Sequence, residues 1–145
     1  MAKFFYKMQN ILDIKEKLET QARNEYAVAN SVLAEEEEKL ERLEVRRQQY
    51  EARLKELYTG MLDMKEIAYV SEAVEMMKYY KQQQENNVKK ARKQVDIARD
   101  RLQEAMQERK THEKLKENAF EQFKIDVATA ESKEVDELTS YRFGS

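Results

Sequence analysis

The chain has 145 residues, 39% of them charged, and a formal net charge of −2 from 27 basic and 29 acidic side chains. This near balance of charge argues against a general binder of polyanions, and the lack of cysteine excludes disulfides and thiolate metal sites. The lack of proline, in a chain rich in Ala, Glu, Lys, Leu, Arg and Gln, favours helix almost everywhere.

Residues 1–7 carry only a short apolar run before charges resume, which does not match a signal peptide. No window approaches the roughly 20 apolar residues that a membrane span needs. We therefore expect a cytoplasmic protein that is made without processing.

A first helix is predicted over residues 4 to about 59, because apolar residues recur there mostly in steps of three and four. This spacing is the a/d seam of a coiled coil, with a slip of one residue between Ala29 and Leu33. The seam residues are Phe4, Met8, Ile11, Leu18, Ala22, Ala29, Leu33, Leu40, Leu43, Tyr50, Leu54 and Leu57.

A turn is predicted at residues 60–63. Gly60 suits the position just past a helix end, where φ > 0 costs glycine nothing. Asp63 can act as the N-cap of a new helix, and Glu66 is placed to complete a capping box. A connection this short forces the two helices to run antiparallel.

A second helix is predicted from residue 64 to about 141. Its seam residues are Ile67, Val70, Val74, Met77, Val88, Ala91, Val95, Ala98, Leu102, Ala105, Ala119, Phe123, Val127 and Ala130. If the turn centres near residue 62, facing positions should sum to about 124, which places Leu33 opposite Ala91 and Phe4 opposite Phe120. Through the alanine-rich part of the seam, large residues then face small ones, as a filled seam requires.

We therefore predict an all-α fold, a long two-helix antiparallel coiled-coil hairpin whose second helix is longer than the first. Residues 1–145 form a single domain in this prediction. Residues 121–145 extend past the partner helix, carry six acids and three bases, and continue an apolar stripe. The stripe consists of Phe123, Val127, Ala130, Leu138 and Tyr141, and nothing else in the predicted hairpin covers it.

Polar groups also enter the predicted seam, in the layers Arg47/Met77, Leu43/Lys81, Leu40/Gln84 and Glu36/Val88. Such layers weaken packing compared with purely apolar ones. They are flanked by two aromatic residues, Tyr79 and Tyr80, that we expect to be exposed. From the residues alone, two interpretations remain for these layers and for the extension: register-fixing layers and a frayed helix end, or two contact sites.

The sequence offers no catalytic, cofactor-binding or metal-binding residues, so an enzyme is not expected. Only Gly60 and Gly144 are available for a phosphate-binding loop, and the single histidine, His112, lies at a seam position where we interpret it as a packing residue. The basic run 89–93 is interpreted as a solvated helix face rather than a nucleic-acid site, because Ala91 within it belongs to the seam.

Three stretches carry a resemblance to a known family. They are Phe4-x-Tyr6-x-Met8-x-x-Ile11-Leu12-Asp13-Ile14 followed by Glu19-x-x-Ala22, then Leu43, Tyr50 and Leu54, and finally Lys133-x-x-Asp136-Glu137-Leu138. Their order and spacing are similar to those of the FliJ family of flagellar export proteins, and the resemblance covers the whole chain.

The resemblance implies a non-enzymatic component of the flagellar type III export apparatus, similar to the central stalk of rotary ATPases. It implies three partners: the hexameric export ATPase, the cytoplasmic domain of the export gate protein, and export chaperones. It implies no nucleic acid and no cofactor, and a cytoplasmic location that reaches the inner face of the inner membrane only through these partners.

Two sets of site residues follow from the resemblance together with the extension and the polar layers. The predicted ATPase-binding residues are Phe4, Phe120, Phe123, Val127, Asp136, Glu137, Leu138 and Tyr141. The predicted gate-binding residues are Leu43, Tyr50, Leu54, Val74, Met77 and Tyr80. Two other functions stay open: a structural coiled-coil tether that self-assembles through residues 121–145, and the analogous stalk of a virulence type III secretion system.

Overall fold

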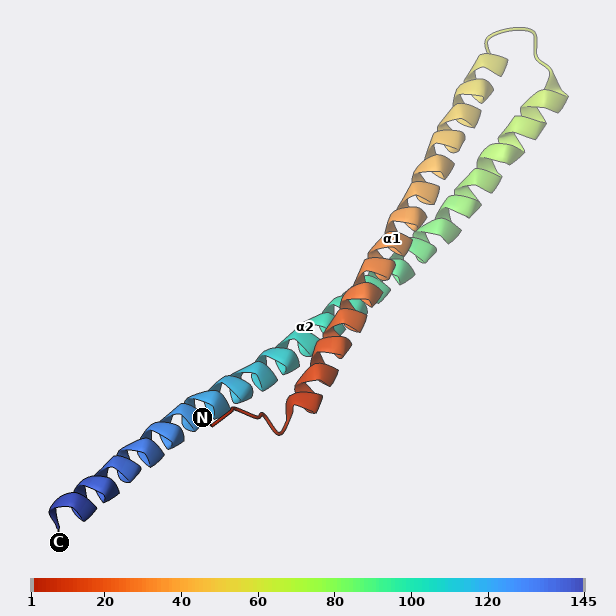
Figure 1. The fold of residues 1–145 in the computed structure, drawn as a ribbon. Helices are drawn as coiled ribbons and strands as arrows, with labels where there is room; N and C mark the ends of the chain where they lie inside the picture. Colours follow the sequence, from red (N-terminus) through yellow and green to blue (C-terminus); the bar gives the residue numbers. More distant parts are fainter. Residues whose placement is uncertain (1, 145) are drawn as a thin grey trace. The chain divides into compact units, whose positions relative to one another are not determined.

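The computed structural model describes residues 2–144, and within them the chain forms two helices and no strand. Helix α1 spans Gln9–Leu57 and helix α2 spans Met64–Phe143, with a short connection between them (Figure 1). The predicted all-α hairpin with a longer second helix is confirmed.

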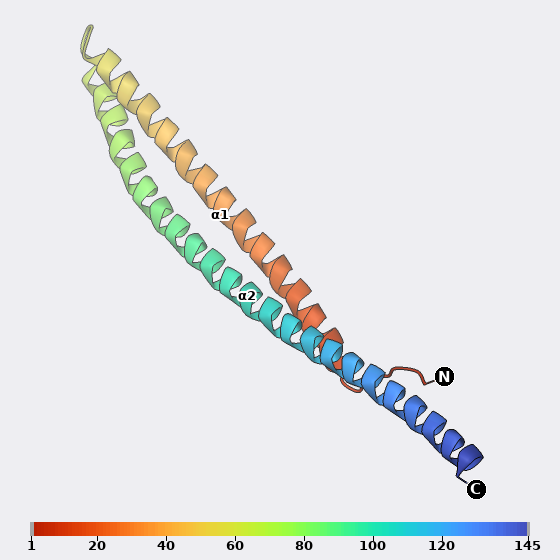
Figure 2. The same cartoon turned by 90° about the vertical axis from the view of Figure 1, so that its left-hand side faces the viewer.

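The chain divides into two compact units. One combines residues 1–22 with residues 102–145 and so holds both chain termini, and the other consists of residues 23–101. In each unit, a segment of α1 lies side by side with an antiparallel segment of α2 (Figures 1 and 2). That the whole chain folds as one domain stays a prediction.

Burial along α1 follows an uninterrupted heptad. Buried and half-buried positions alternate in steps of three and four at Leu12, Lys15, Glu19, Ala22, Tyr26, Ala29, Leu33, Glu36, Leu40, Leu43, Arg47, Tyr50, Leu54 and Leu57. The predicted slip between Ala29 and Leu33 is therefore wrong. The slip follows from placing the apolar Leu18 in the seam. In the structure Leu18 is 43% exposed, and its neighbour Glu19 is buried, with 7% of its surface exposed.

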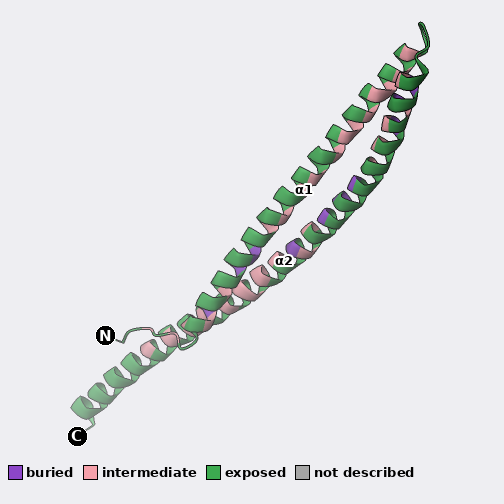
Figure 3. Cartoon of the chain, turned by 90° about the vertical axis from the view of Figure 1, so that its right-hand side faces the viewer, coloured by how far each residue is buried: buried purple, intermediate pink, exposed green. Residues whose placement is uncertain are grey.

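The heptad of α2 is equally regular and faces α1 (Figure 3). It runs through Ile67, Val70, Val74, Met77, Lys81, Gln84, Val88, Ala91, Val95, Ala98, Leu102, Ala105, Arg109, His112, Lys116, Ala119 and Phe123. Every seam position of α1 has a counterpart here at the predicted sum of 124. Two ion pairs between the helices, Lys15–Glu108 at 2.9 Å and Lys81–Glu44 at 2.8 Å, lie within one residue of this register.

The N-terminal boundary of α1 differs from the prediction. The helix begins at Gln9, not near residue 4, and residues 2–6 are not helical. The aromatic residues at 4–6 have modest helix propensity, and no acidic side chain stabilises the first turn. The backbone N–H of Gln9 donates to the carbonyl of Tyr6 at 3.2 Å, so a turn precedes the helix.

The turn also forms differently from the prediction. No residue among 2–144 has a positive φ, so Gly60 does not supply a left-handed helix end. Helix α1 ends at Leu57 because the N–H groups of Tyr58 and Thr59 donate three residues back, to Lys55 and Glu56, and the Thr59 hydroxyl donates to the Glu56 carbonyl at 2.7 Å. These bonds satisfy carbonyls at the helix terminus.

Asp63 is the N-cap of α2, as predicted. Its Oδ1 accepts from the N–H groups of Lys65 at 3.1 Å and Glu66 at 3.3 Å. The predicted capping box is not completed, because the Glu66 carboxylate instead accepts from Arg53 on α1 at 2.7 Å. This ion pair joins the two helices next to the turn.

Candidate functional site

The N-terminal segment meets α2 in an aromatic cluster of Phe4, Phe120 and Phe123. The Phe4 ring lies 5.1 Å from that of Phe120 in an edge-on arrangement and 5.4 Å from that of Phe123, measured between centroids. Lys124 extends its ammonium group over the Phe120 ring at 5.1 Å. The prediction that nothing in the chain covers Phe123 is therefore wrong: the non-helical N-terminus brings Phe4 onto it.

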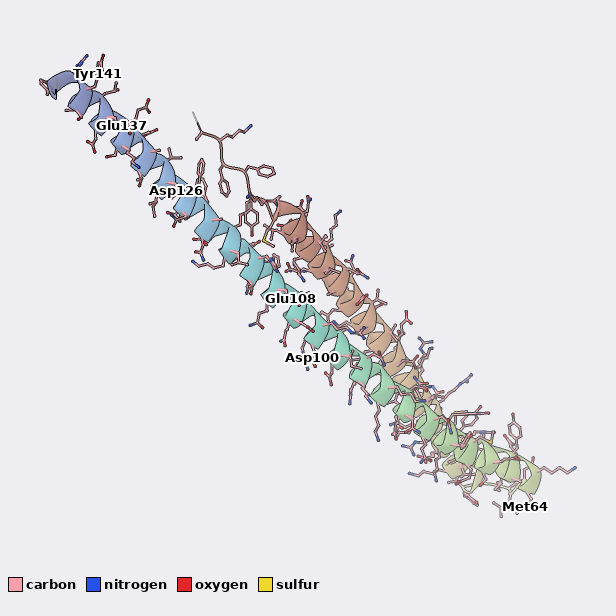
Figure 4. All side chains as sticks on the ribbon, turned by 90° about the horizontal axis from the view of Figure 1, so that it is seen from below. Met64, Asp100, Glu108, Asp126, Glu137 and Tyr141 are labelled. Carbon is pink, nitrogen blue, oxygen red and sulfur yellow. The ribbon has the colours of Figure 1, made fainter. Side chains whose placement is uncertain are left out.

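Beyond this cluster, α2 continues without a neighbour in the part of the chain that the structure describes. Val127 is half-buried, and every residue from 128 to 144 is exposed. Leu138 and Tyr141 are 61% and 83% exposed. Glu137 and Tyr141 lie on the part of the helix that has no neighbouring segment (Figure 4). We call residues 128–144 the C-terminal extension. Of the predicted ATPase-binding residues, Asp136, Glu137, Leu138 and Tyr141 belong to it.

The predicted gate-binding residues are placed differently. Val74 is buried, and Leu43, Tyr50, Leu54 and Met77 are half-buried positions of the seam. Only Tyr80 is exposed, at 42%, and its ring lies 5.9 Å from that of Tyr79. These residues are close to one another in the second unit, but as a set they form helix packing with one exposed aromatic edge. Their role in binding stays a prediction.

The polar layers of the seam are satisfied by specific partners. Buried Gln84 donates from Nε2 to both the backbone carbonyl, at 2.9 Å, and the carboxylate of Glu36, and its Oε1 accepts from Asn87 at 3.1 Å. Because a polar side chain in a seam is tolerated only where its hydrogen bonds are made, this layer fixes the register of the two helices.

A second polar layer is a cluster of charges around Glu44. Its carboxylate contacts Arg47 at 2.5 Å and Lys81 at 2.8 Å, and Arg47 also reaches Glu51 at 2.8 Å. Hydrogen bonds from Arg47 and Lys81 lower the pKa of Glu44 from 4.5 to about 2. The seam cations Arg47 and Lys81 are thus directed to the acids on one side of the hairpin.

The model of the family described as Flagellar FliJ protein matches residues 4–145, nearly the whole chain. The chain belongs to the FliJ family. It is therefore a flagellar export-associated protein, and the family is one of non-enzymatic export components. No match was found among curated proteins or among solved structures.

The described part of this FliJ-family chain contains neither a metal-binding group of side chains nor a membrane-spanning helix. Within residues 2–144, His, Asp and Glu side chains do not gather into a group that could hold a metal ion. Neither helix there combines the length and the hydropathy that crossing a bilayer requires. His112 lies half-buried in the seam, and its Nδ1 is buried without a hydrogen-bond partner.

Sequence reasoning missed the ion pair between Glu19 and Arg109. Both residues occupy seam positions, and they join α1 to α2 in the first unit. The available signal was the heptad itself: continuing it without a slip places an acid and a base in the seam at neighbouring levels.

Proposed function

We propose that this FliJ-family chain is a cytoplasmic, stalk-like component that binds the hexameric flagellar export ATPase through its C-terminal extension. The observation that carries the proposal is the bare helix 128–144, on which Leu138 and Tyr141 are largely exposed. Large apolar side chains on an unpaired helix are typical of a binding surface.

The charge of the extension suits a ring with basic groups in its lining. Residues 128–144 hold four acids, Glu131, Glu134, Asp136 and Glu137, against two bases, Lys133 and Arg142. The aromatic cluster of Phe4, Phe120 and Phe123 fixes the base of the extension against the N-terminus. In this proposal the cluster positions the extension, while Leu138 and Tyr141 make the contact.

We further propose that the second unit contacts the cytoplasmic domain of the export gate, through the exposed edge of Tyr79 and Tyr80, and that export chaperones bind the same protein. The support is the family together with two adjacent aromatic rings exposed at 56% and 42%. In this proposal, the ATPase contact and the gate contact lie in different units of the chain.

The ATPase contact is tested with the double variant Leu138→Ala/Tyr141→Ala of the full chain. We expect it to lose stimulation of the export ATPase while the helix content, measured by circular dichroism, stays that of the wild type. The matched control is Tyr58→Ala/Met61→Ala, which removes one aromatic and one apolar side chain, 61% and 97% exposed, near the turn. If the extension variant stimulates as well as the wild type, the extension is not the ATPase-binding site.

A self-assembling tether is the competing function, because the same exposed stripe could pair with a second copy. Sedimentation of the wild type and of Leu138→Glu distinguishes the two. The stalk predicts a monomer for both proteins, whereas the tether predicts an oligomer that Leu138→Glu dissociates.

A further inference from the structure

The two long sides of the hairpin in the second unit can be told apart by heptad position. With the seam at a and d, positions g and c lie on one side and positions e and b on the other. Ion pairs between the helices establish which positions meet: Arg53 and Glu66, both at g, pair at 2.7 Å, and Glu37 and Arg92, both at e, pair at 3.4 Å. We call these the g side and the e side.

The sides differ in charge where α1 residues 39–49 lie opposite α2 residues 75–85. The g side there carries three bases, Lys39, Arg42 and Arg46, and no acid. Its other residues are Gln49, Met76, Tyr80 and Gln83. The e side over the same stretch carries four acids and one base, at Glu41, Glu44, Gln48, Glu75, Lys78, Gln82 and Glu85. An otherwise almost neutral chain is therefore polarised across its width.

The g side also carries an apolar stripe on α2. Tyr69, Ala73, Met76 and Tyr80 follow one another in steps of four, three and four, which is the spacing of one helix face. Tyr69 is 70% exposed, and Met76 and Tyr80 are each 42% exposed. A helix laid parallel to α2 could cover such a stripe with its own apolar seam.

The cations beside this stripe are available to a partner. Arg46 makes no ion pair among the described residues, and the Arg42–Glu38 pair is exposed on both sides, at 69% and 65%. A shallow groove runs along this part of α1 and reaches Gln84 in the seam; Lys39, Arg42 and Arg46 line it together with Glu38 and Glu41. By contrast, the seam cations Arg47 and Lys81 are held by Glu44.

We infer that the g side of the second unit binds an acidic amphipathic α-helix of a partner protein, which packs as a third helix of the coiled coil. Its apolar face covers Tyr69, Met76 and Tyr80, and its carboxylates pair with Arg42 and Arg46. The e side has no comparable set of free cations, and its four acids outnumber Lys78 and the two seam cations that Glu44 holds; this difference sets which side the helix takes. The inference rests on the proposed gate contact, which includes Tyr80, and names the chemistry that this surface recognises.

The test uses the full chain and a fluorescent synthetic helical peptide with Leu and Ile at a and d and Glu at the flanking positions. We expect the acidic peptide to bind, and a peptide with Lys in place of every Glu to bind much more weakly. Arg42→Glu/Arg46→Glu should raise the Kd of the acidic peptide about tenfold or more, since two attractive charges become repulsive. The control Lys78→Glu, which changes a base on the e side, should leave the Kd within about twofold.

Equal binding of both peptides, or binding that the Arg42→Glu/Arg46→Glu variant does not weaken, would overturn the inference. So would a single-stranded oligonucleotide that binds with the same dependence on these arginines. A parallel pull-down with the gate domain separates the two proposals. Gate capture without peptide binding refutes the third-helix inference and leaves the proposed gate contact standing. Peptide binding without gate capture refutes the proposed gate contact and leaves the third-helix inference standing.

Discussion

Arg109 on α2 holds the carboxylate of Glu19 on α1 with two donors, Nε and Nη2, the latter at 3.3 Å. Arg109 donates at the same time to Glu113 on its own helix at 2.8 Å. The hydrogen bond to Glu19 raises the pKa of Arg109 above its ordinary value. Because the Glu19 side chain is only 9% exposed, the charge it brings into the seam depends on this partner.

The charge-reversal variant Glu19→Arg should therefore lower the thermal midpoint of the chain, because it places two cations at neighbouring levels of the seam. Arg109→Glu should do the same with two acids. The double variant Glu19→Arg/Arg109→Glu should recover part of the loss, as measured by thermal unfolding followed by circular dichroism. A double variant that is as unstable as the two single losses combined would show that the pair does not act as a unit.

Gly60→Ala should leave stability unchanged or raise it slightly, by about 0.5 kcal/mol, because alanine restricts the unfolded chain. Gly60 has no positive φ, and an added Cβ would meet nothing within 4 Å. Asp63→Ala in the same connection is the contrasting variant and should cost about 1 kcal/mol, because two N–H groups lose their cap. The free energy of unfolding of Gly60→Ala and Asp63→Ala, measured by urea unfolding, checks both expectations. A clear loss in Gly60→Ala would contradict the turn geometry.

The Glu44 cluster should give the chain a pH-dependent part of its stability. The folded-state pKa of Glu44 is lowered from 4.5 to about 2, so its contribution is present above about pH 4.5 and is lost as the pH falls through 2. Glu44→Gln should thus lower the thermal midpoint at pH 7 and lower it progressively less between pH 4.5 and 2. Glu41→Gln, which removes an exposed acid of α1, is the control. A difference between wild type and Glu44→Gln that does not change with pH would refute the linkage.

Phe4→Ala should release the N-terminal segment from α2 and cost about 1 kcal/mol from the lost ring contacts. Proteolysis should then cut residues 2–8 faster, and amide exchange should speed up around Phe120 and Phe123. Phe5→Ala is the matched control, because Phe5 is 81% exposed and its loss should change neither measurement. Equal protection in both variants would show that the Phe4 contacts do not hold the terminus.

Most of this fold could be predicted from the sequence. Apolar spacing indicated both helices, the shortness of the connection indicated their antiparallel arrangement, and Asp63 was identified as an N-cap from its type and position. The register followed from the position of the turn, and it places large residues opposite small ones, as with Leu33 and Ala91. These features depend on local spacing and on side-chain volume, which a sequence shows directly.

Tertiary structure alone decided the rest. Glu19 is a core residue because Arg109 lies on the neighbouring helix to neutralise it. The heptad signals that both occupy seam positions, but their pairing over ninety residues becomes visible only once the helices are placed together. The register places Phe4 opposite Phe120, but only the structure shows that residues 2–6 reach α2 without being helical and that Phe4 also packs on Phe123. Likewise, α1 alone carries opposite charge on its g and e sides, but only the pairing of the helices puts the apolar stripe of α2 beside the cations of α1. Pairing over long sequence distances, unlike helix formation, depends on which surfaces meet in space.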